Sequence, residues 1–540
     1  MRRALVPVGG LALVTMVLVA VPVTPANARV HTVHTVRRVD RVITVHIRDN
    51  LFAPANLNVA AGTTVRWIND GRNTHNVTPD SGRAYGSGNL KPGKSYVHTF
   101  ADPGAFAYYC TLHGTPTKGQ HAQLAVGNDV AVTPITPVGA GDHPVPNFKA
   151  SGRTIRVPAD ANTIQGAVDR AAPGDLVLVS PGVYREAVTV GTDGVVIRGV
   201  DRNTTILDGQ FKRQNGVFVV GADGVAVENL TARNYTENGF FWNGVLGYRG
   251  SYLTAYRNGD YGIYAYDSQY GQFDHSYASG SPDSGFYIGQ CNPCHAVITD
   301  VVSEFNELGY SGTNSSGDLF LVNSVWSKNR TGIVPNSLDS EELAPQGMAT
   351  MAGNVVNDNG NPDAARSATP EFDAAFGGGI VIIGGVNDVI TRNRAIGNTK
   401  IGIAIAPNPG IQQNAYPSTG NAVTDNVVQQ SGMVDLAVVL PTADDRNCFS
   451  GNTVGATAPS NLEQLKPCGG AAGSGDLSAG AVDIGNFLDT SANPPGKSYK
   501  VTPVPRRQRN LAKAATAHAR PAGAPVQVDL ARITVPVSAG

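Results

Sequence analysis

The sequence predicts an all-β protein with a β-sandwich near its N-terminus and a β-solenoid after it. Glycine and proline are abundant, at 63 and 34 of 540 residues, which indicates many turns. Short strand-like segments separated by turn residues fill the first part of the chain. A glycine followed by an apolar residue then recurs about every 23 positions, which is typical of a solenoid.

The composition excludes several classes of protein. Hydrophobic residues make up 41% of the chain, enough for packed cores, so a wholly disordered chain is excluded. Charged residues make up 15% and the formal net charge is −1, so we expect no nucleic-acid partner, because that function needs a basic surface. Five cysteines are too few for a scaffold built on disulfides.

The N-terminus predicts a secretory signal peptide at residues 1–28. Two arginines follow the first methionine, residues 4–23 are almost wholly apolar, and residues 26–28 form a small-x-small cleavage pattern. We therefore expect a secreted or extracytoplasmic protein, with the cell wall as one location, and no membrane span after cleavage. The alternative is an uncleaved anchor, because the apolar run is long enough to cross a bilayer.

Residues 40–127 predict a β-sandwich, because short strand-like segments follow one another at a spacing of roughly 8–12 residues. These segments are 42–47, 57–59, 63–68, 95–100 and 105–110. Turn residues separate them, among them Lys91-Pro92-Gly93 and Asp102-Pro103-Gly104.

Three side chains of this domain form a candidate metal site: His75, Cys110 and His113. One thiolate and two imidazole nitrogens, with a weak axial ligand, form the trigonal site of blue-copper proteins. Cys110 and His113 are three positions apart at the end of a strand, so both can turn toward one ion. The alternative is a buried free cysteine with two ordinary surface histidines.

The surrounding residues follow a longer pattern. It reads Phe52-x-Pro54-x-x-Leu57-x-Val59-x-x-Gly62-x-Thr64-Val65-x-Trp67-x-Asn69, then His75-x-Val77, then Tyr109-Cys110-x-x-His113. This pattern resembles the plastocyanin/azurin (cupredoxin) family. The resemblance implies a Greek-key sandwich that binds one type 1-like copper through His75, Cys110 and His113.

One position departs from that family. Where its members usually have a Gly-Met pair, this sequence has Gly119-Gln120. The resemblance therefore implies an axial amide oxygen from Gln120, which favours Cu(II) and lowers the reduction potential relative to methionine. His121 is a less suitable axial ligand, and a vestigial site is the alternative interpretation.

Residues 128–150 are rich in proline and predict an extended linker. Residues 163–171 then predict a short amphipathic helix, followed by a Pro-Gly-Asp turn and an apolar strand. This stretch resembles the N-terminal cap and first coil of the pectate-lyase-like right-handed single-stranded parallel β-helix, in which a helix covers the open end. We expect this β-helix over residues 151–455 and a partly disordered, low-complexity tail over 456–540.

The repeat glycines set the register of the β-helix. They are Gly239, Gly262, Gly285, Gly309, Gly332, Gly379 and Gly402. The 47 residues between Gly332 and Gly379 predict one coil with insertions. If the residue after each glycine points inward, the next one points outward, because side chains alternate along a strand.

The cysteines of the β-helix predict two disulfides. Cys291-x-x-Cys294 lies on a loop, where a structural disulfide is favoured over a thioredoxin-like redox pair, half of a zinc site or a haem attachment site. Cys448 and Cys468 flank the end of the repeats and form the expected second pair. Cys110 is then the unpaired thiol that a copper ligand must be.

Two ladders on the wall predict a saccharide or cation site. Two residues before successive repeat glycines stand carboxylates, which include Asp260, Asp283 and Glu307, followed by Arg330. Two residues after them stand aromatic residues, which include Tyr264 and Tyr287. The carboxylates would be catalytic acid and base or would hold a cation such as calcium, while Tyr264, Tyr287 and Arg330 would bind a sugar. The alternative is that the carboxylates accept from backbone amides and the aromatic rings pack on one another.

Three functions follow from these observations. The first is a secreted copper-binding protein for electron transfer or copper handling, with an unidentified redox partner protein and a β-helix scaffold that binds polysaccharide. The second is a carbohydrate-active β-helix enzyme (lyase, hydrolase or epimerase) with an accessory copper domain. The third is a cell-surface binding protein without catalysis.

Overall fold

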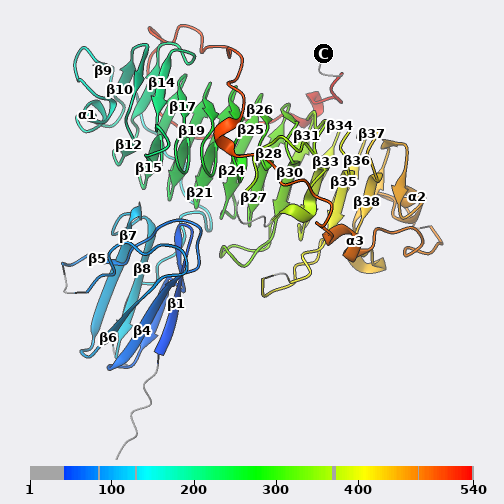
Figure 1. The fold of residues 1–540 in the computed structure, drawn as a ribbon, viewed down its shortest axis with the longest axis horizontal. Coiled ribbons are helices and arrows are strands. Elements are labelled where there is room, and N and C mark those ends of the chain that lie inside the picture. Colours follow the sequence, from blue (N-terminus) through cyan, green and yellow to red (C-terminus); the bar gives the residue numbers. More distant parts are fainter. Residues whose placement is uncertain are drawn as a thin grey trace, which may run out of the picture. The chain divides into compact units, whose positions relative to one another are not determined.

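A computed structural model describes residues 42–82, 85–127, 130–367, 372–410, 412–471 and 473–537, and nearly all of its regular structure is β (Figure 1). The expected signal peptide, residues 1–28, lies outside the described residues. In the described part of the chain, no helix is long and apolar enough to cross a membrane.

The first domain is a sandwich of two four-stranded sheets, ordered β2-β1-β4-β6 and β3-β8-β7-β5. The strands are β1 (Val42–Arg48), β2 (Leu51–Ala53), β3 (Asn56–Val59), β4 (Thr63–Asn69), β5 (Thr78–Pro79), β6 (Ser95–Phe100), β7 (Gly104–Gly114) and β8 (Gly119–Val126). Alternation along β4 places Val65 and Trp67 in the core and leaves Arg66 exposed, as a two-layer sandwich requires. The predicted all-β sandwich is confirmed.

The linker after the sandwich is held against the β-helix. Its described residues, 130–150, contain no helix or strand, and the backbone makes hydrogen bonds instead. Gly139 N–H donates to Asp267 Oδ1 at 2.7 Å, and the carbonyl of His143 accepts from the Tyr270 hydroxyl at 2.5 Å. These bonds satisfy polar groups that an extended chain would otherwise leave to water.

The second domain is a parallel β-helix that begins under a helical cap. Helix α1 (Ile164–Val168) starts at Thr163, whose hydroxyl accepts from Gly166 N–H, and it buries Ile164, Ala167 and Val168. These apolar side chains close the end of the core, as predicted.

The strands of the β-helix form three parallel stacks (Figure 1). The first is a sheet of β9 (Thr154–Val157), β10 (Leu176–Val179), β13 (Val196–Gly199), β16 (Val225–Glu228), β19 (Leu246–Ser251), β22 (Gln269–Asp274), β25 (Ala296–Thr299), β28 (Ser316–Val322), β31 (Gly347–Ala352), β33 (Val389–Thr391), β36 (Ala422–Thr424) and β39 (Cys448–Ser450). The second comprises β12 (Val188–Val190), β15 (Val217–Val220), β18 (Phe240–Asn243), β21 (Ile263–Tyr266), β24 (Ser284–Gly289), β27 (Leu308–Thr313), β30 (Thr331–Asn336), β32 (Gly378–Ile383), β35 (Ile401–Ala406), β38 (Val434–Val438) and β41 (Thr457–Ala458). The third is split into β11 (Gly182–Tyr184), β14 (Thr205–Asp208), β17 (Thr231–Arg233), β20 (Thr254–Tyr256), β23 (Tyr277–Ser279), β26 (Val302–Glu304) and β29 (Val325–Ser327), and β34 (Arg394–Ile396), β37 (Val427–Gln429) and β40 (Thr453–Val454).

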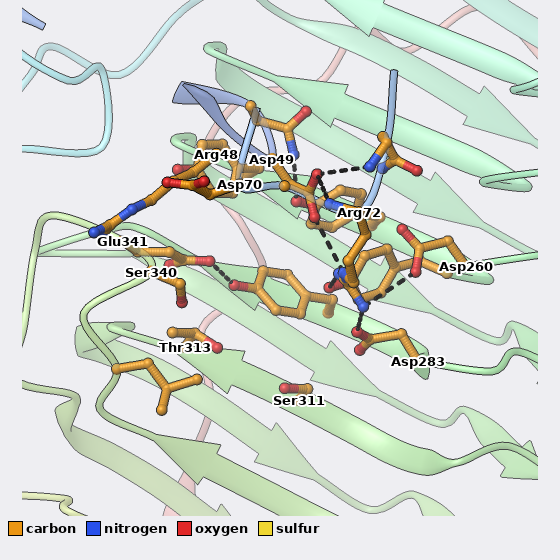
Figure 2. A pocket seen from close by; sticks show the side chains of 18 of the residues that line it. Arg48, Asp49, Asp70, Arg72, Asp260, Asp283, Ser311, Thr313, Ser340 and Glu341 are labelled. Carbon is orange, nitrogen blue, oxygen red and sulfur yellow. Dashed lines mark hydrogen bonds and ion pairs between the residues drawn. The ribbon is translucent and has the colours of Figure 1, made fainter. Parts of the chain in front are cut away.

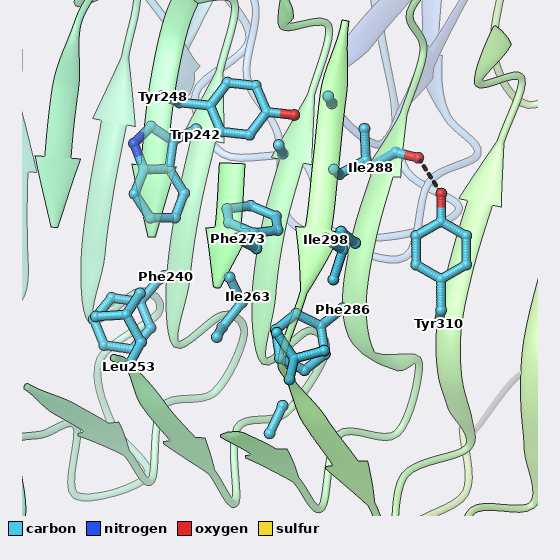
Figure 3. Close-up of a cluster of buried hydrophobic side chains, with 14 of the residues drawn as sticks. Phe240, Trp242, Tyr248, Leu253, Ile263, Phe273, Phe286, Ile288, Ile298 and Tyr310 are labelled. Carbon is cyan, nitrogen blue, oxygen red and sulfur yellow. Dashed lines mark hydrogen bonds between the residues drawn. The ribbon is translucent and has the colours of Figure 1, made fainter. Parts of the chain in front are cut away.

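The repeat glycines have the register that the sequence predicts. Phe240 pairs with Ile263, Ile263 with Phe286, and so on along the second stack, and these side chains fill the core (Figure 3). A Cβ atom on Gly239 would lie 2.6 Å from the carbonyl oxygen of Gly262, so the close approach of successive coils demands glycine. Ile333 pairs with Ile380, which confirms that the 47-residue interval is one coil.

The C-terminal segment corrects an expectation, because it packs along the β-helix instead of being disordered. Arginines of the wall donate to its backbone carbonyls: Arg198 to Ala517 and Arg392 to Leu530, for example. The composition of this segment was interpreted as a sign of disorder. The segment is instead held in place by hydrogen bonds that guanidinium groups donate to its backbone. The helices of this segment are α2 (Leu462–Leu465) and α3 (Ile484–Leu488), and its 3-10 turns are Tyr499–Val501 and Leu530–Arg532. Two further 3-10 turns lie earlier in the chain, at Asp373–Ala375 and Ala443–Asp445.

Both predicted disulfides are confirmed. Cys291 is bonded to Cys294, and Cys448 to Cys468. Cys110 is the free cysteine of the described residues, and it is buried.

Candidate metal centre

The structure brings the three predicted equatorial ligands together. His75 comes from the loop between β4 and β5, while Cys110 and His113 lie on β7, and their ligand atoms lie within 4.8 Å of one another. Cys110 Sγ is 3.5 Å from His113 Nδ1 and 3.9 Å from His75 Nδ1. All three side chains are buried.

An irregularity in β7 explains how Cys110 and His113 share one site. In a regular strand, side chains three positions apart point to opposite faces. The pairing of β7 with β8 shifts register between Tyr109 and Gly114, which re-aims one of the two side chains. Gly114 permits this approach, because a Cβ atom there would lie 2.6 Å from the backbone of Gln120.

Gln120 on β8 turns its oxygen toward the site. Its side-chain amide nitrogen donates to the carbonyls of Arg48 and Leu51, both at 3.0 Å. These two bonds fix the orientation of the amide group, so Oε1 faces inward, 2.9 Å from His75 Nδ1. The structure therefore places an oxygen donor beside the other three ligands.

The environment of Cys110 favours the thiolate, the form that binds metals. Burial raises the pKa of the thiol, but hydrogen bonds and charge from His113 and His75 outweigh it and lower the pKa to about 5. The backbone N–H of Asn76 also donates to Sγ at 3.4 Å. Asn76 Oδ1 accepts from Thr111 N–H at 2.9 Å, which ties the His75 loop to β7.

The outer nitrogens of both histidines face carboxylates. His75 Nε2 lies 3.3 Å from Asp49 Oδ1, and His113 Nε2 lies 4.0 Å from Oε2 of Glu237 on the β-helix. Burial alone would raise the pKa of Asp49. His75 and Arg72 lower it by more than burial raises it, so the pKa of Asp49 lies well below its usual value. Such carboxylates orient a ligating imidazole and raise its basicity.

Arg72 links this centre to the carboxylate ladder of the β-helix (Figure 2). Its guanidinium lies 3.0 Å from Asp49 Oδ2 and 3.4 Å from Asp260 Oδ1, and it forms an ion pair with Asp283. Arg72 also donates to the Tyr261 hydroxyl at 3.0 Å. Asp49 and Arg72 were missed by sequence reasoning, because no spacing rule pairs position 72 with positions 260 and 283.

The aromatic ladder forms, but it is not an open platform, so that expectation is wrong. Phe241 and Tyr264 stack at 4.4 Å and point out of the β-helix, as alternation predicts. Leu51 of the sandwich packs on them, Asn50 donates to the Tyr264 hydroxyl at 2.8 Å, and the Tyr287 hydroxyl donates to Glu341. Tyr264 and Tyr287 are therefore only 4% and 2% exposed.

Glu307 and Arg330 also differ from expectation. Arg330 is fully buried, with Nε 3.1 Å from Glu307 Oε1 and a terminal nitrogen 3.3 Å from Asp373 Oδ1. Two protein carboxylates thus already neutralise the guanidinium, and no sugar carboxylate can approach it. For Asp260 and Asp283, Arg72 supplies the positive charge that was expected from a cation such as calcium.

Comparisons with known proteins support this interpretation of the sequence. Residues 13–121 match the family model of the cupredoxin-like domain, and residues 238–408 match that of the right-handed β-helix region. Plastocyanin from Scenedesmus fuscus is 30% identical over 80 residues, which are 13% of this chain and 82% of the plastocyanin.

Two solved structures show similarity to one domain each. A purple cupredoxin from Nitrosopumilus maritimus is 26% identical, with a TM-score of 0.14, over 16% of this chain and 98% of that one. The A-module of the mannuronan C-5 epimerase AlgE4 from Azotobacter vinelandii is 15% identical, with a TM-score of 0.38, over 56% of this chain and 94% of that one.

The donor set fits the metal that this homology implies, since one buried thiolate, two imidazole nitrogens and a weak oxygen donor suit copper. The N-terminal domain is therefore a copper-binding domain. The chain belongs to the cupredoxin family, as a plastocyanin-like domain followed by a right-handed β-helix.

Proposed function

We propose that this protein is a secreted one-electron carrier with a single type 1-like copper. His75, Cys110 and His113 would be the equatorial ligands and Gln120 the axial one. The copper supplies a one-electron change between Cu(I) and Cu(II), and the chain's residues hold the ligands so that little moves when the charge changes.

One observation carries this proposal: the four donor side chains are already gathered and buried. His75, Cys110 and Gln120 are 0% exposed and His113 is 3% exposed. Their positions are held by the β7 irregularity, the Asn76 hydrogen bonds and the two amide bonds of Gln120. A pre-arranged donor set that is shielded from solvent lowers the reorganisation that each electron exchange requires.

The β-helix supports the proposal as a scaffold that bears directly on the copper domain. Asn243 Nδ2 donates to the carbonyl oxygen of His113 at 2.8 Å. Lys118, in the turn between β7 and β8, donates to the Gly221 carbonyl at 2.8 Å and lies 3.2 Å from Asp223. Both contacts fix the ligand-bearing end of β7, and a redox partner protein would exchange electrons with the domain held in this way.

A copper titration of the purified full chain tests the proposal. We expect one equivalent of Cu(II) to produce an intense thiolate-to-copper band in the visible spectrum, which reversible reduction bleaches. A colourless Cu(II) complex, or a coloured complex that cannot be reduced and reoxidised, would overturn it.

A further inference from the structure

A cavity of about 730 Å³ lies between the loops of the copper domain and the wall of the β-helix. This volume falls in the range of small-molecule sites, roughly 300–1,000 Å³. Its lining includes His113, Arg72, Asp283 and Tyr266, so it extends from a copper ligand to the carboxylate ladder. Figure 2 shows Arg72 and Asp283 in this lining.

Three residues that line this cavity each have a buried oxygen atom with no hydrogen-bond partner among the described residues. These atoms are Asp283 Oδ1, the Tyr266 hydroxyl and Glu341 Oε2. Asp283 and Tyr266 are 7% and 3% exposed. Leaving a buried polar atom unpaired costs about 1–3 kcal/mol, more for a charged group, so a bound molecule that donates to these atoms would gain from them.

The charge of the lining selects the kind of molecule. Arg72 is shared among Asp49, Asp260 and Asp283, so one cation faces three carboxylates, and Glu341 adds a fourth carboxyl group. An anionic ligand would be repelled, whereas a ligand with positive charge and hydrogen-bond donors would complete the set.

We propose that this cavity binds a small organic cation of the amino-sugar class, with its ammonium group on Asp283 and Glu341 and its hydroxyl groups toward Tyr266. Its contact with a copper ligand at His113 rests on the proposed function, while the binding itself does not.

The state of Glu341 supports this assignment. Burial raises the pKa of this carboxyl well above its usual range, and the charges of Asp267 and Asp283 raise it further. An ammonium group beside Glu341 would supply the cation that this carboxyl lacks and would favour its ionised form.

Calorimetry with D-glucosamine and D-glucose tests the proposal, because the two sugars differ in one ammonium group. Near pH 6, where the amine is protonated, we expect the full chain to bind glucosamine at least tenfold more tightly than glucose. Tyr266→Phe and Glu341→Gln should each weaken glucosamine binding severalfold. Tyr277→Phe is the control, since its hydroxyl donates to Glu304 outside the cavity, and it should leave the affinity unchanged.

Each other outcome overturns the proposal. Equal affinity for both sugars would identify a neutral saccharide site, and absence of binding would remove the site. Full affinity in both Tyr266→Phe and Glu341→Gln would place the sugar elsewhere. The measurement is made on both copper-free and copper-loaded protein. If the chain binds the sugar but fails the copper titration, only the proposed function is overturned. In copper-loaded protein, glucosamine should shift the visible band, and an unshifted band would remove the contact with His113.

Discussion

Arg72 and Asp283 form an ion pair between the copper domain and the β-helix, although 211 positions separate them in the sequence. Because Arg72 also binds Asp49, and Asp49 faces the outer nitrogen of His75, a continuous polar chain joins the copper ligand to the β-helix wall. The β-helix is therefore part of the environment of the metal centre.

Arg72→Ala should strongly destabilise the contact between the domains. It would leave Asp49, Asp260 and Asp283 without their cation. Breaking a fully buried ion pair costs on the order of 3–5 kcal/mol, which is an upper bound here because the Arg72 side chain is 30% exposed. We expect a lower midpoint in urea denaturation. The exposed Arg66 of β4 offers a matched control, and Arg66→Ala should change stability by no more than about 0.5 kcal/mol.

A double variant separates charge from packing in this prediction. If the uncompensated carboxylate causes the loss, Arg72→Ala combined with Asp283→Asn should be more stable than Arg72→Ala alone. Equal stability of the single and double variants would show that the Asp283 charge does not contribute.

How the β-helix core packs could be predicted from sequence, whereas what covers its wall could not. The 23-residue glycine phase is local information, and it correctly placed Ile263 inside and Tyr264 outside. That Asn50 and Leu51 would cover Tyr264 depends on contacts more than two hundred positions away, which no periodicity encodes. An outward side chain was therefore taken for an exposed one.

Cys110→Ser should abolish the visible band of the copper-loaded protein, because a serine hydroxyl cannot replace the thiolate that gives the band. Absorbance after addition of one equivalent of Cu(II) measures the effect. His121→Ala is the control, since His121 Nδ1 contacts the Gly119 carbonyl and the side chain is not part of the ligand group. A band that survives in Cys110→Ser would exclude Cys110 as the ligand.

Gln120→Met should raise the reduction potential. An amide oxygen is a harder donor that favours Cu(II), and a thioether favours Cu(I). Redox titration followed at the visible band measures the midpoint. The substitution also removes the donors to Arg48 and Leu51, so Gln120→Glu provides a second comparison that keeps an oxygen at this position. An unchanged potential in Gln120→Met would show that Gln120 is not axial.

The ligand set could be predicted from sequence and its supports could not, for a physical reason. The candidate ligands are His75, Cys110 and His113. Their side chains bind metals and they stand in a family sequence pattern, so the sequence alone identifies them as ligands. Asp49 and Arg72 are ordinary polar residues whose role comes only from their neighbours in the fold.

Asp267→Asn should reduce the pH dependence of stability. Burial raises the pKa of this carboxyl from 3.8 to about 7, although backbone N–H groups of Gly139 and Val138 offset part of the shift. A carboxyl whose pKa is higher in the folded state holds its proton longer than the unfolded chain does. Its contribution to stability is therefore full below about pH 4 and falls by about 1.4 kcal/mol per pH unit until about pH 7.

Asparagine keeps what the fold requires at this position. Residue 267 has a φ of +49°, a conformation that asparagine adopts readily, and its Oδ1 can still accept from Gly139. We expect Asp267→Asn to melt higher than the parent chain at pH 8 and to show a smaller difference in Tm between pH 5 and pH 8. Asp300→Asn is the matched control, because Asp300 has a φ of +55° but an exposed side chain. Equal pH profiles for the parent chain and Asp267→Asn would mean that Asp267 is ionised in the folded protein, and that the linker is held there by a charged carboxylate instead of a neutral one.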